Sequence, residues 1–439
     1  MNALFEDFSA SNAATWKERL SKDLKGITFA DLSVTDRNGI NIHPFYTSED
    51  ELKTNTAIFD HKDWTICAAV KVLDEKMANK KALNELQNGA AGLCFDINSR
   101  VDFSVLLEEI QLAYIYTQFN VYSDIDLFLS DWKEFLAAQN MDIEALDCTI
   151  NFDPFATLLK GGAELSEGIK NDFINLFAVT KSISVDAFIY QNAGANSAYQ
   201  LACCIAQLNE QLHWLDKSGK LIALKKVSII HSAGTDFFEE IAKLRALQIL
   251  ISNVMAQYNI NPKVTLHIET SDTYRSAFDS YSNLLRDTVA GMAAVLGGCT
   301  SLLIHPFDQS INEAGEFNSR MSRNQQLIFK EESYLGQIAD ASAGSFYLEK
   351  LTEQLAEIAW ASFQQIENDG GLVASFEKGI IKETIEIQAA QWVQEYKEGK
   401  RVLIGVNKYV NAKDEPKAQK QKEPNNKGLD IINLTEEII

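Results

Sequence analysis

A short segment around residue 267 carries the side chains best suited to chemistry. In the run VTLHIET, the polar residues Thr265, His267 and Glu269 alternate with apolar ones. Alternate residues of a strand share one face, so the spacing predicts a polar set that lines the mouth of a barrel. A histidine placed there can act as an acid, a base or an electrophile. The alternative interpretation of His267 is a hydrogen-bonded structural histidine at the end of a strand.

Other groupings of reactive side chains predict less. His305 and Asp308 could begin a metal site, but no third ligand is suitably spaced, so a turn after a strand is favoured. The cysteines are scattered, without a Cys-x-x-Cys pair, and are interpreted as buried small hydrophobic residues in a reducing cytoplasm. They are Cys67, Cys94, Cys148, Cys203, Cys204 and Cys299. We therefore predict no metal ligands in this chain.

The elements that must position these side chains alternate along the chain. Eight short runs rich in β-branched and apolar residues are separated by segments of helical period, which predicts βαβ units and a parallel sheet. The runs are 64–72, 92–97, 112–119, 148–152, 183–190, 227–231, 264–270 and 301–306. Eight such units fit a (β/α)₈ TIM barrel, an α/β fold, with a doubly wound open sheet as the alternative. The third run could instead be part of a helix.

The composition divides the chain into four parts. We predict an N-terminal arm over residues 1–55, the barrel over 56–335 and a C-terminal helical region over 336–410. Residues 411–439 are predicted to form a disordered tail, because the stretch NAKDEPKAQKQKEPNNKG is polar and without period. The last residues, LDIINLTEEII, are apolar enough to dock onto a partner.

Charge and length exclude several classes of protein. The chain has 439 residues and a net charge of −21, which argues against nucleic acid and anionic membrane surfaces as partners. No apolar run approaches the ~20 residues that a membrane span needs. The N-terminus has neither a basic region nor an apolar region typical of a secretory signal. These features predict a cytoplasmic globular protein.

The segment 316–367 combines helical spacing with an unusual order of polar residues. Phe317, Met321 and Ile328 fall on one predicted helical face, and Leu351 and Leu355 begin a second. Apolar faces of this kind are typical of packing, but packing does not require the order Arg-Asn-Gln-Gln, Glu-Glu-Ser and Gly-Ser-Phe-Tyr that the segment also contains. Further motifs follow one another as NFDPF, NAGAN, FFEEIAKLRAL, HIETS and LRDTVAGMAAVLGG.

This order of motifs resembles the substrate-barrel domain of the methylmalonyl-CoA mutase family over nearly the whole chain. The resemblance implies a TIM barrel and places His267 where the family has an active-site histidine near the thioester carbonyl. It also exposes three departures. The Asp-x-His-x-x-Gly motif of the flavodoxin-like cobalamin domain is absent, and the loop NTAIFDHKDW lacks the family's arginine and tyrosine. Gln191 stands where catalytic chains have an arginine, whose planar fork grips a carboxylate.

The resemblance with these losses implies the small (beta), non-catalytic subunit of a heterodimeric methylmalonyl-CoA mutase of propionate metabolism. Its partner would be the large subunit, which holds adenosylcobalamin and interconverts succinyl-CoA and (R)-methylmalonyl-CoA. This chain would stabilise that subunit, hold no cofactor and use no catalytic residue, with His267 vestigial. Bulky strands such as VSII at 227 and LLI at 302 suit a filled barrel. The alternative is a catalytic acyl-CoA mutase barrel that uses cobalamin held by a separate chain.

Overall fold

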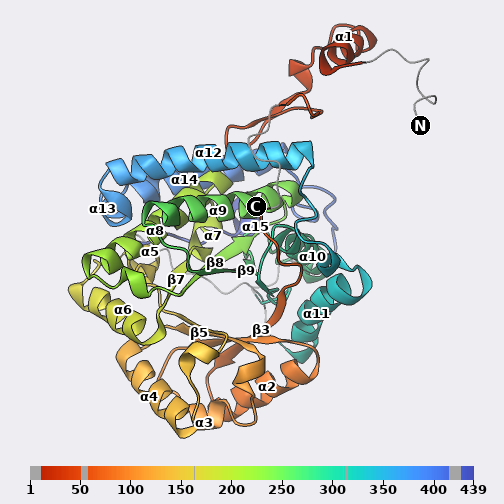
Figure 1. The fold of residues 1–439 in the computed structure, drawn as a ribbon. Coiled ribbons are helices and arrows are strands. Elements are labelled where there is room, and N and C mark those ends of the chain that lie inside the picture. The colour runs from red at the N-terminus through yellow and green to blue at the C-terminus, as the bar shows by residue number, and fades with distance from the viewer. Residues whose placement is uncertain (1–10, 51–57, 163, 310, 312–314, 415–426) are drawn as a thin grey trace, which may run out of the picture.

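Eight parallel strands form a nearly closed barrel in the computed structural model of the chain, which describes residues 11–50, 58–162, 164–309, 311, 315–414 and 427–439. The strands are β3 (Thr65–Val72), β4 (Gly92–Ile97), β5 (Tyr116–Val121), β6 (Cys148–Asn151), β7 (Ser182–Asp186), β8 (Lys226–Ala233), β9 (Lys263–Thr270) and β10 (Ser301–Leu303). Their order around the sheet is β6-β5-β4-β3-β10-β9-β8-β7, so β6 and β7 flank the seam (Figure 1). The predicted TIM barrel is confirmed.

Helices follow the strands and form the outer layer (Figure 1). They are α2 (Glu75–Gln87), α3 (Phe103–Leu106), α4 (Ile125–Ala138), α5 (Ala156–Gly161), α6 (Glu167–Thr180), α7 (Phe188–Asn192), α8 (Ser197–Lys217), α9 (Phe237–Gln257) and α10 (Ser280–Leu296). After the barrel come α11 (Glu316–Leu327), α12 (Phe346–Asn368), α13 (Gly371–Glu377), α14 (Ile380–Lys397) and α15 (Leu434–Ile438). Among the described residues, no helix is long and apolar enough to cross a bilayer.

All eight predicted strands exist, with three corrections at their ends. The run at 301–306 is a strand only over Ser301–Leu303. The run at 112–119 begins with a 3₁₀ turn, Leu112–Tyr114, before β5 starts. The run at 183–190 ends as a strand at Asp186, and its second half forms the short helix α7. Apolar residues dominate the last two of these runs, so hydrophobicity alone could not separate a strand from the helical residues beside it.

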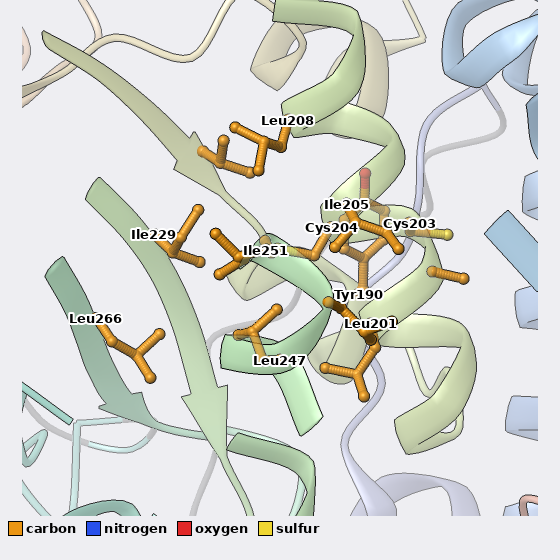
Figure 2. Packing of buried hydrophobic residues seen from close by; sticks show 14 of the residues in the cluster. Tyr190, Leu201, Cys203, Cys204, Ile205, Leu208, Ile229, Leu247, Ile251 and Leu266 are labelled. Carbon is orange, nitrogen blue, oxygen red and sulfur yellow. The ribbon is translucent and has the colours of Figure 1, made fainter. Parts of the chain in front are cut away.

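The main hydrophobic core lies between the strands and the helical layer, not inside the barrel. Outward residues of β8 and β9 pack against α8 and α9, and Figure 2 shows Ile229 and Leu266 facing Leu208, Leu247 and Ile251. Of the bulky residues that we expected to fill the barrel, this outer core contains Val227, Ile229, Leu302 and Ile304. They alternate with the inward side chains, because successive residues of a strand point to opposite faces. The barrel interior is therefore lined by the other half of each strand.

The N-terminal arm contains α1 (Ala13–Asp23) and the two-stranded sheet β1 (Val34–Thr35) and β2 (Asn41–Ile42). None of the residues of α1 is buried, and the helix stands away from the barrel (Figure 1). Farther along the arm, Ile40 is buried and joins the main core. The arm is therefore anchored near its end while α1 projects from the body.

The Arg-Asn-Gln-Gln part of the unusual polar order is largely buried, whereas the Glu-Glu-Ser part at 331–333 is exposed. In α11 the buried residues are Ser322, Arg323, Gln325 and Gln326, whereas the apolar face that we predicted for this helix is largely exposed. Arg323 forms a buried ion pair with Glu85 of α2. The side chain of Gln326 accepts a hydrogen bond from Trp64 at 3.2 Å. The motif thus joins α11 to the barrel by specific polar contacts.

Candidate functional site

His267 lies inside the barrel, on the inward face of β9, and is almost fully buried. Its Nδ1 is hydrogen-bonded to Ser301 Oγ at 2.8 Å, on the neighbouring strand β10. Its Nε2 faces Cys94 Sγ at 3.9 Å and Glu269 Oε1 at 3.4 Å. The nitrogen that could polarise a substrate carbonyl is therefore already surrounded by side chains of this chain.

Glu269 links His267 to a second histidine. Its Oε2 accepts a hydrogen bond from His305 Nε2 at 2.8 Å. Burial raises the pKa of Glu269, but the two histidines lower it further, and the net shift is well below the usual range. Burial lowers the pKa of His267, whereas Cys94 and Glu269 raise it, and the net shift is upward. Burial likewise opposes charge on His305, and Glu269 again makes the net pKa shift upward.

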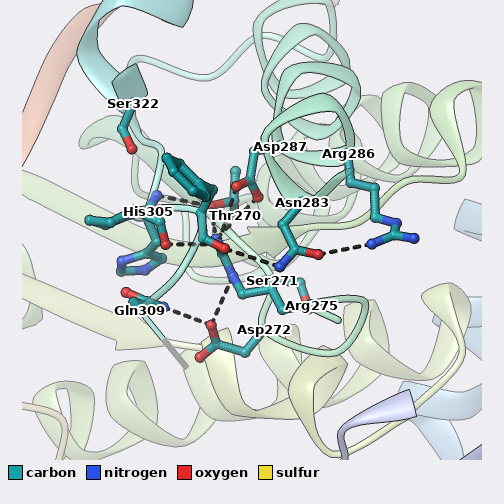
Figure 3. Close-up of polar contacts among 12 residues, drawn as sticks. Thr270, Ser271, Asp272, Arg275, Asn283, Arg286, Asp287, His305, Gln309 and Ser322 are labelled. Carbon is teal, nitrogen blue, oxygen red and sulfur yellow. Dashed lines mark hydrogen bonds and ion pairs between the residues drawn. The ribbon is translucent and has the colours of Figure 1, made fainter. Parts of the chain in front are cut away.

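The loops after β9 and β10 hold His305 in place (Figure 3). Thr270 Oγ1 accepts hydrogen bonds from the backbone N–H of His305 and from Arg275 Nη2, both at 3.0 Å. Arg275 also pairs with the buried Asp287 of α10. The segment from His305 to Asp308 is thus a fixed turn after a strand, as predicted.

Side chains fill the barrel axis at the level of His267. Tyr116 is on β5, and β5 and β9 are four places apart among the eight strands, on opposite sides of the barrel. The rings of Tyr116 and His267 nevertheless stack with their centroids 6.1 Å apart. A second layer contains Ser228 Oγ, which lies 3.1 Å from Thr149 Oγ1 and 3.0 Å from Thr265 Oγ1. In this layer the inward residues are small and hydroxylated, and they contact one another between β6, β8 and β9.

Gln191, the residue at the family's arginine position, belongs to an internal network. Its Nε2 donates to Glu240 Oε1 at 2.9 Å, and its Oε1 accepts from Lys243 Nζ at 2.9 Å and Ser232 Oγ at 2.9 Å. Lys243 also forms an ion pair with Glu240 at 2.6 Å. Both ends of the Gln191 amide are engaged within the chain, so this side chain is not directed at a ligand.

The predicted arginine- and tyrosine-free loop is described from residue 58 onward, and residues 55–57 lie outside the described part. The backbone N–H of Ile58 donates to Asp340 Oδ2 at 2.9 Å. His61 Nε2 is hydrogen-bonded to the carbonyl of Gly298 at 3.0 Å. These contacts attach the loop to the segments before β10 and after α11.

The end of the chain docks over the loops at the carboxyl ends of the strands. The backbone N–H groups of Leu429, Ile432 and Leu434 donate to carbonyls of Leu159, Asn192 and Thr273 at 2.7, 2.8 and 3.0 Å. Those carbonyls follow β6, β7 and β9 respectively. Leu429 and Leu434 are buried. Residues 427–439 are therefore ordered, unlike the tail that we predicted, while residues 415–426 lie outside the described residues.

Two residues of the interior were missed as members of a site. All six cysteines were predicted to be buried. Cys67 on β3 and Cys94 on β4 are buried, and of the six only Cys148 is half-buried. Their sulfur atoms and a ring nitrogen of His267 all lie within 4.8 Å of one another. The three residues come from different strands at unrelated sequence spacing. Only the alternation that puts each of them on the inward face of its own strand could have signalled the grouping.

The fold places this chain in the class of (β/α)₈ barrel proteins, with a polar barrel interior and additional C-terminal helices. Comparison with known sequences identifies the family within this class. Residues 89–431 match the family model described as methylmalonyl-CoA mutase. The chain belongs to the methylmalonyl-CoA mutase family.

Three curated relatives illustrate this membership. The "Methylmalonyl-CoA mutase small subunit" of Porphyromonas gingivalis is 29% identical over 93% of this chain and 71% of the relative. The "Probable methylmalonyl-CoA mutase small subunit" of Mycobacterium bovis is 36% identical over 53% of this chain and 39% of the relative. The "Methylmalonyl-CoA mutase large subunit" of Propionibacterium freudenreichii subsp. shermanii is 34% identical over 52% of this chain and 32% of the relative. The chain spans less than half the length of the last two.

Proposed function

We propose that this chain is the small, non-catalytic subunit of a heterodimeric methylmalonyl-CoA mutase. In this proposal a large subunit holds adenosylcobalamin and interconverts succinyl-CoA and (R)-methylmalonyl-CoA. The small subunit stabilises the large one and binds neither cofactor nor substrate. The names of relatives as small and large subunits support an assembly of this kind.

The contact between Tyr116 and His267 carries the non-catalytic part of the proposal. An acyl-CoA that threads along a barrel axis needs that axis free of side chains, and here two rings from opposite strands meet on it. Gln191 supports the same conclusion, because its amide is saturated by Glu240, Lys243 and Ser232. A substrate carboxylate would have to displace that network without gaining a cation to neutralise it.

A surface for the partner lies on α10 and α11. Gln325 of α11 donates to Thr288 Oγ1 of α10 at 2.8 Å, which holds the two helices side by side. Tyr281, Leu285 and Phe317 on these helices are 63%, 68% and 47% exposed. Large apolar side chains that gather on neighbouring helices are typical of an interface between proteins. We assign this face, the α10–α11 face, to the large subunit.

Activity measurements on separate and combined subunits test the proposal. The purified chain with adenosylcobalamin and methylmalonyl-CoA should show no turnover and no cofactor binding, whereas the large subunit with this chain should turn over. Turnover by this chain and cofactor alone would contradict the non-catalytic assignment.

Co-purification tests the α10–α11 face. The double variant Leu285→Asp, Phe317→Asp should lower recovery of this chain with a tagged large subunit by about tenfold or more, since buried charges without partners strongly oppose association. The control is Ile222→Asp, because Ile222 is 91% exposed near the opposite end of the barrel strands. Unchanged recovery of the double variant would place the interface elsewhere.

The retained His267 favours a second candidate, a catalytic barrel that uses cobalamin from a separate chain. Kinetics of the assembled complex carrying His267→Ala decide between the two. Loss of one electrostatic contact to a reacting carbonyl lowers kcat on the order of 100-fold. A loss of that size in a complex shown intact by gel filtration would move the chemistry into this barrel and contradict our proposal.

A further inference from the structure

Two thiols and an imidazole converge inside the barrel, beside the axis. Cys67, Cys94 and His267 each direct one ligand atom into the same small volume, and these atoms all lie within 4.8 Å of one another. All three side chains are buried, with at most 3% of each residue exposed. Two sulfurs and one imidazole nitrogen form a donor set that selects Zn²⁺ over Mg²⁺ or Ca²⁺, which prefer oxygen ligands.

We propose that Cys67, Cys94 and His267 bind one structural zinc ion inside the barrel. In a tetrahedral site, Zn–S distances of ~2.3 Å and Zn–N distances of ~2.0 Å put the sulfur and nitrogen ligands about 3.5 Å apart. Cys94 Sγ and His267 Nε2 are 3.9 Å apart, so this pair needs to close by only a few tenths of an ångström, and Cys67 Sγ lies within 4.8 Å of both atoms. The proposal is independent of the function proposed above, because zinc content is a property of this chain alone.

The histidine is oriented as a zinc ligand. Its Nδ1 is hydrogen-bonded to Ser301 Oγ at 2.8 Å, which leaves Nε2 directed at the thiols. A hydrogen bond to the nitrogen that does not bind the metal is the usual way in which a protein fixes the tautomer and ring angle of such a histidine. The same arrangement places Glu269 Oε1 3.4 Å from Nε2.

The backbone opposite Cys67 leaves room for its sulfur. Gly92 pairs with Cys67 in the ladder between β3 and β4. A Cβ on Gly92 would lie 2.7 Å from Cys67 Sγ and 3.2 Å from the ring of Tyr116. A side chain at residue 92 would therefore push the sulfur out of the cluster. Tyr116 and Leu303 close the remaining sides with apolar surface, which excludes water from the site.

The charges balance when the metal is bound. Cysteine binds zinc as a thiolate, so each of the two thiols must lose its proton when the metal enters the cluster. Binding breaks the two S–H bonds and the Nε2–H bond of His267, forms two Zn–S bonds and one Zn–N bond, and releases the three protons to solvent, with no oxidation or reduction. Two thiolates neutralise Zn²⁺, while the ionised Glu269 pairs with His305 at 2.8 Å. No unpaired charge remains inside the barrel, where it would be costly.

Metal analysis of the purified full-length chain tests the proposal. Protein prepared with reductant and without chelator should contain about one zinc ion per chain. Cys94→Ser and His267→Ala should each reduce this content to less than ~0.1 in protein shown folded by circular dichroism. The control is Cys148→Ser, because Cys148 begins β6 outside the cluster and its loss should leave the zinc content unchanged.

X-ray absorption of the wild-type chain keeps the test decisive if the variants fail to fold. The zinc edge should show two sulfur scatterers with the remaining ligands nitrogen or oxygen, and replacement by Co²⁺ should give thiolate-to-cobalt charge transfer. Less than ~0.1 zinc per folded wild-type chain, or zinc without sulfur ligands, would overturn the proposal. A count of free thiols that is two short in protein unfolded with a chelator and without reductant would show a Cys67–Cys94 disulfide and would also overturn it.

Discussion

The rings of Tyr116 and His267 meet across the barrel axis, 6.1 Å apart between centroids, although their strands lie on opposite sides of the sheet. Tyr116 also donates from its hydroxyl to Gln118 Oε1 at 2.8 Å, and its residue is only 7% exposed. A residue that closes the centre of a barrel contributes to the packing of several strands at once. The contact therefore makes the interior a second core, smaller and more polar than the one under the helices.

Truncation of Tyr116 measures this contribution. Tyr116→Ala should lower the free energy of unfolding by about 3 kcal/mol or more, because it leaves a cavity and deprives Gln118 of a partner. Urea denaturation compares it with Tyr114→Ala, since Tyr114 is 83% exposed. A loss below about 1 kcal/mol would indicate an axis that is open rather than packed.

The buried pair of Arg323 and Glu85 offers a second test, because it connects α11 to α2. Arg323→Met should destabilise the chain by about 3–5 kcal/mol, since it leaves the Glu85 carboxylate buried without its cation. Adding Glu85→Leu should restore most of that stability. Chemical denaturation of the single and double variants gives the coupling, and Arg320→Met, at an exposed position of α11, is the control. A double variant no more stable than the single one would refute the pairing argument.

These two contacts also show what the sequence could predict. The eight strands were predictable because β-branched runs alternate with helical periods, and each run depends on local residues. The contact of Tyr116 with His267 and the pair of Arg323 with Glu85 join residues more than a hundred positions apart. Such contacts depend on barrel closure and helix docking, which a pattern of neighbouring residues does not encode. For the same reason the apolar face of α11 was predicted on the wrong side.

In the interior site, too, features set by neighbouring residues were predictable, whereas contacts between distant residues were not. His267 was predictable as an inward residue from alternation on its strand, and its family resemblance gave it a role. Cys67 and Cys94 were predicted only to be buried, because their meeting depends on the register between strands. The apolar residues that include Leu429 and Leu434 were predictable as a docking segment, but not their place over this chain's own barrel, which depends on the fold of distant loops.

Restoring the family's arginine at residue 191 should not restore a binding site. Gln191→Arg places a second cation beside Lys243, which lies 2.9 Å from the present side chain and is fully buried. We expect a loss of about 2 kcal/mol or more in stability, from charge repulsion and lack of space. Thermal denaturation measures it, and the double variant Gln191→Arg, Lys243→Met should recover part of the loss. Unchanged stability of the single variant would mean that the network around Gln191 is loose.

Acid should destabilise the chain through His231. Burial and the nearby Lys243 lower the pKa of His231 to about 3 in the folded chain. The unfolded chain takes up a proton near pH 6.5 while the folded chain does not, so stability is lost as the pH falls from about 6.5 towards 3. At pH 5 this difference is worth about 2 kcal/mol.

Denaturation of His231→Leu at pH 7 and pH 5 isolates this contribution. The leucine variant should lose about 2 kcal/mol less than the wild-type chain over that interval. His213→Gln, at an exposed position of α8, provides the control and should follow the wild type. Equal losses in the wild-type chain and His231→Leu would show that His231 is protonated in the folded state.

The last prediction concerns the docked C-terminal segment. Leu434 is fully buried, and its N–H donates to the carbonyl of Thr273 after β9. Leu434→Ala removes the main apolar anchor of α15, and a buried leucine of this kind contributes about 2–5 kcal/mol. The segment is attached at one end only, so its release limits the global loss and exposes residues 427–439 to proteases. We therefore expect a lower melting temperature together with faster cleavage near the C-terminus, which mass spectrometry of the digest measures.

Ile439→Ala is the matched control, because Ile439 is 75% exposed and its side chain should contribute less than about 0.5 kcal/mol. Equal cleavage rates for the two variants would mean that Leu434 does not hold the segment over the barrel.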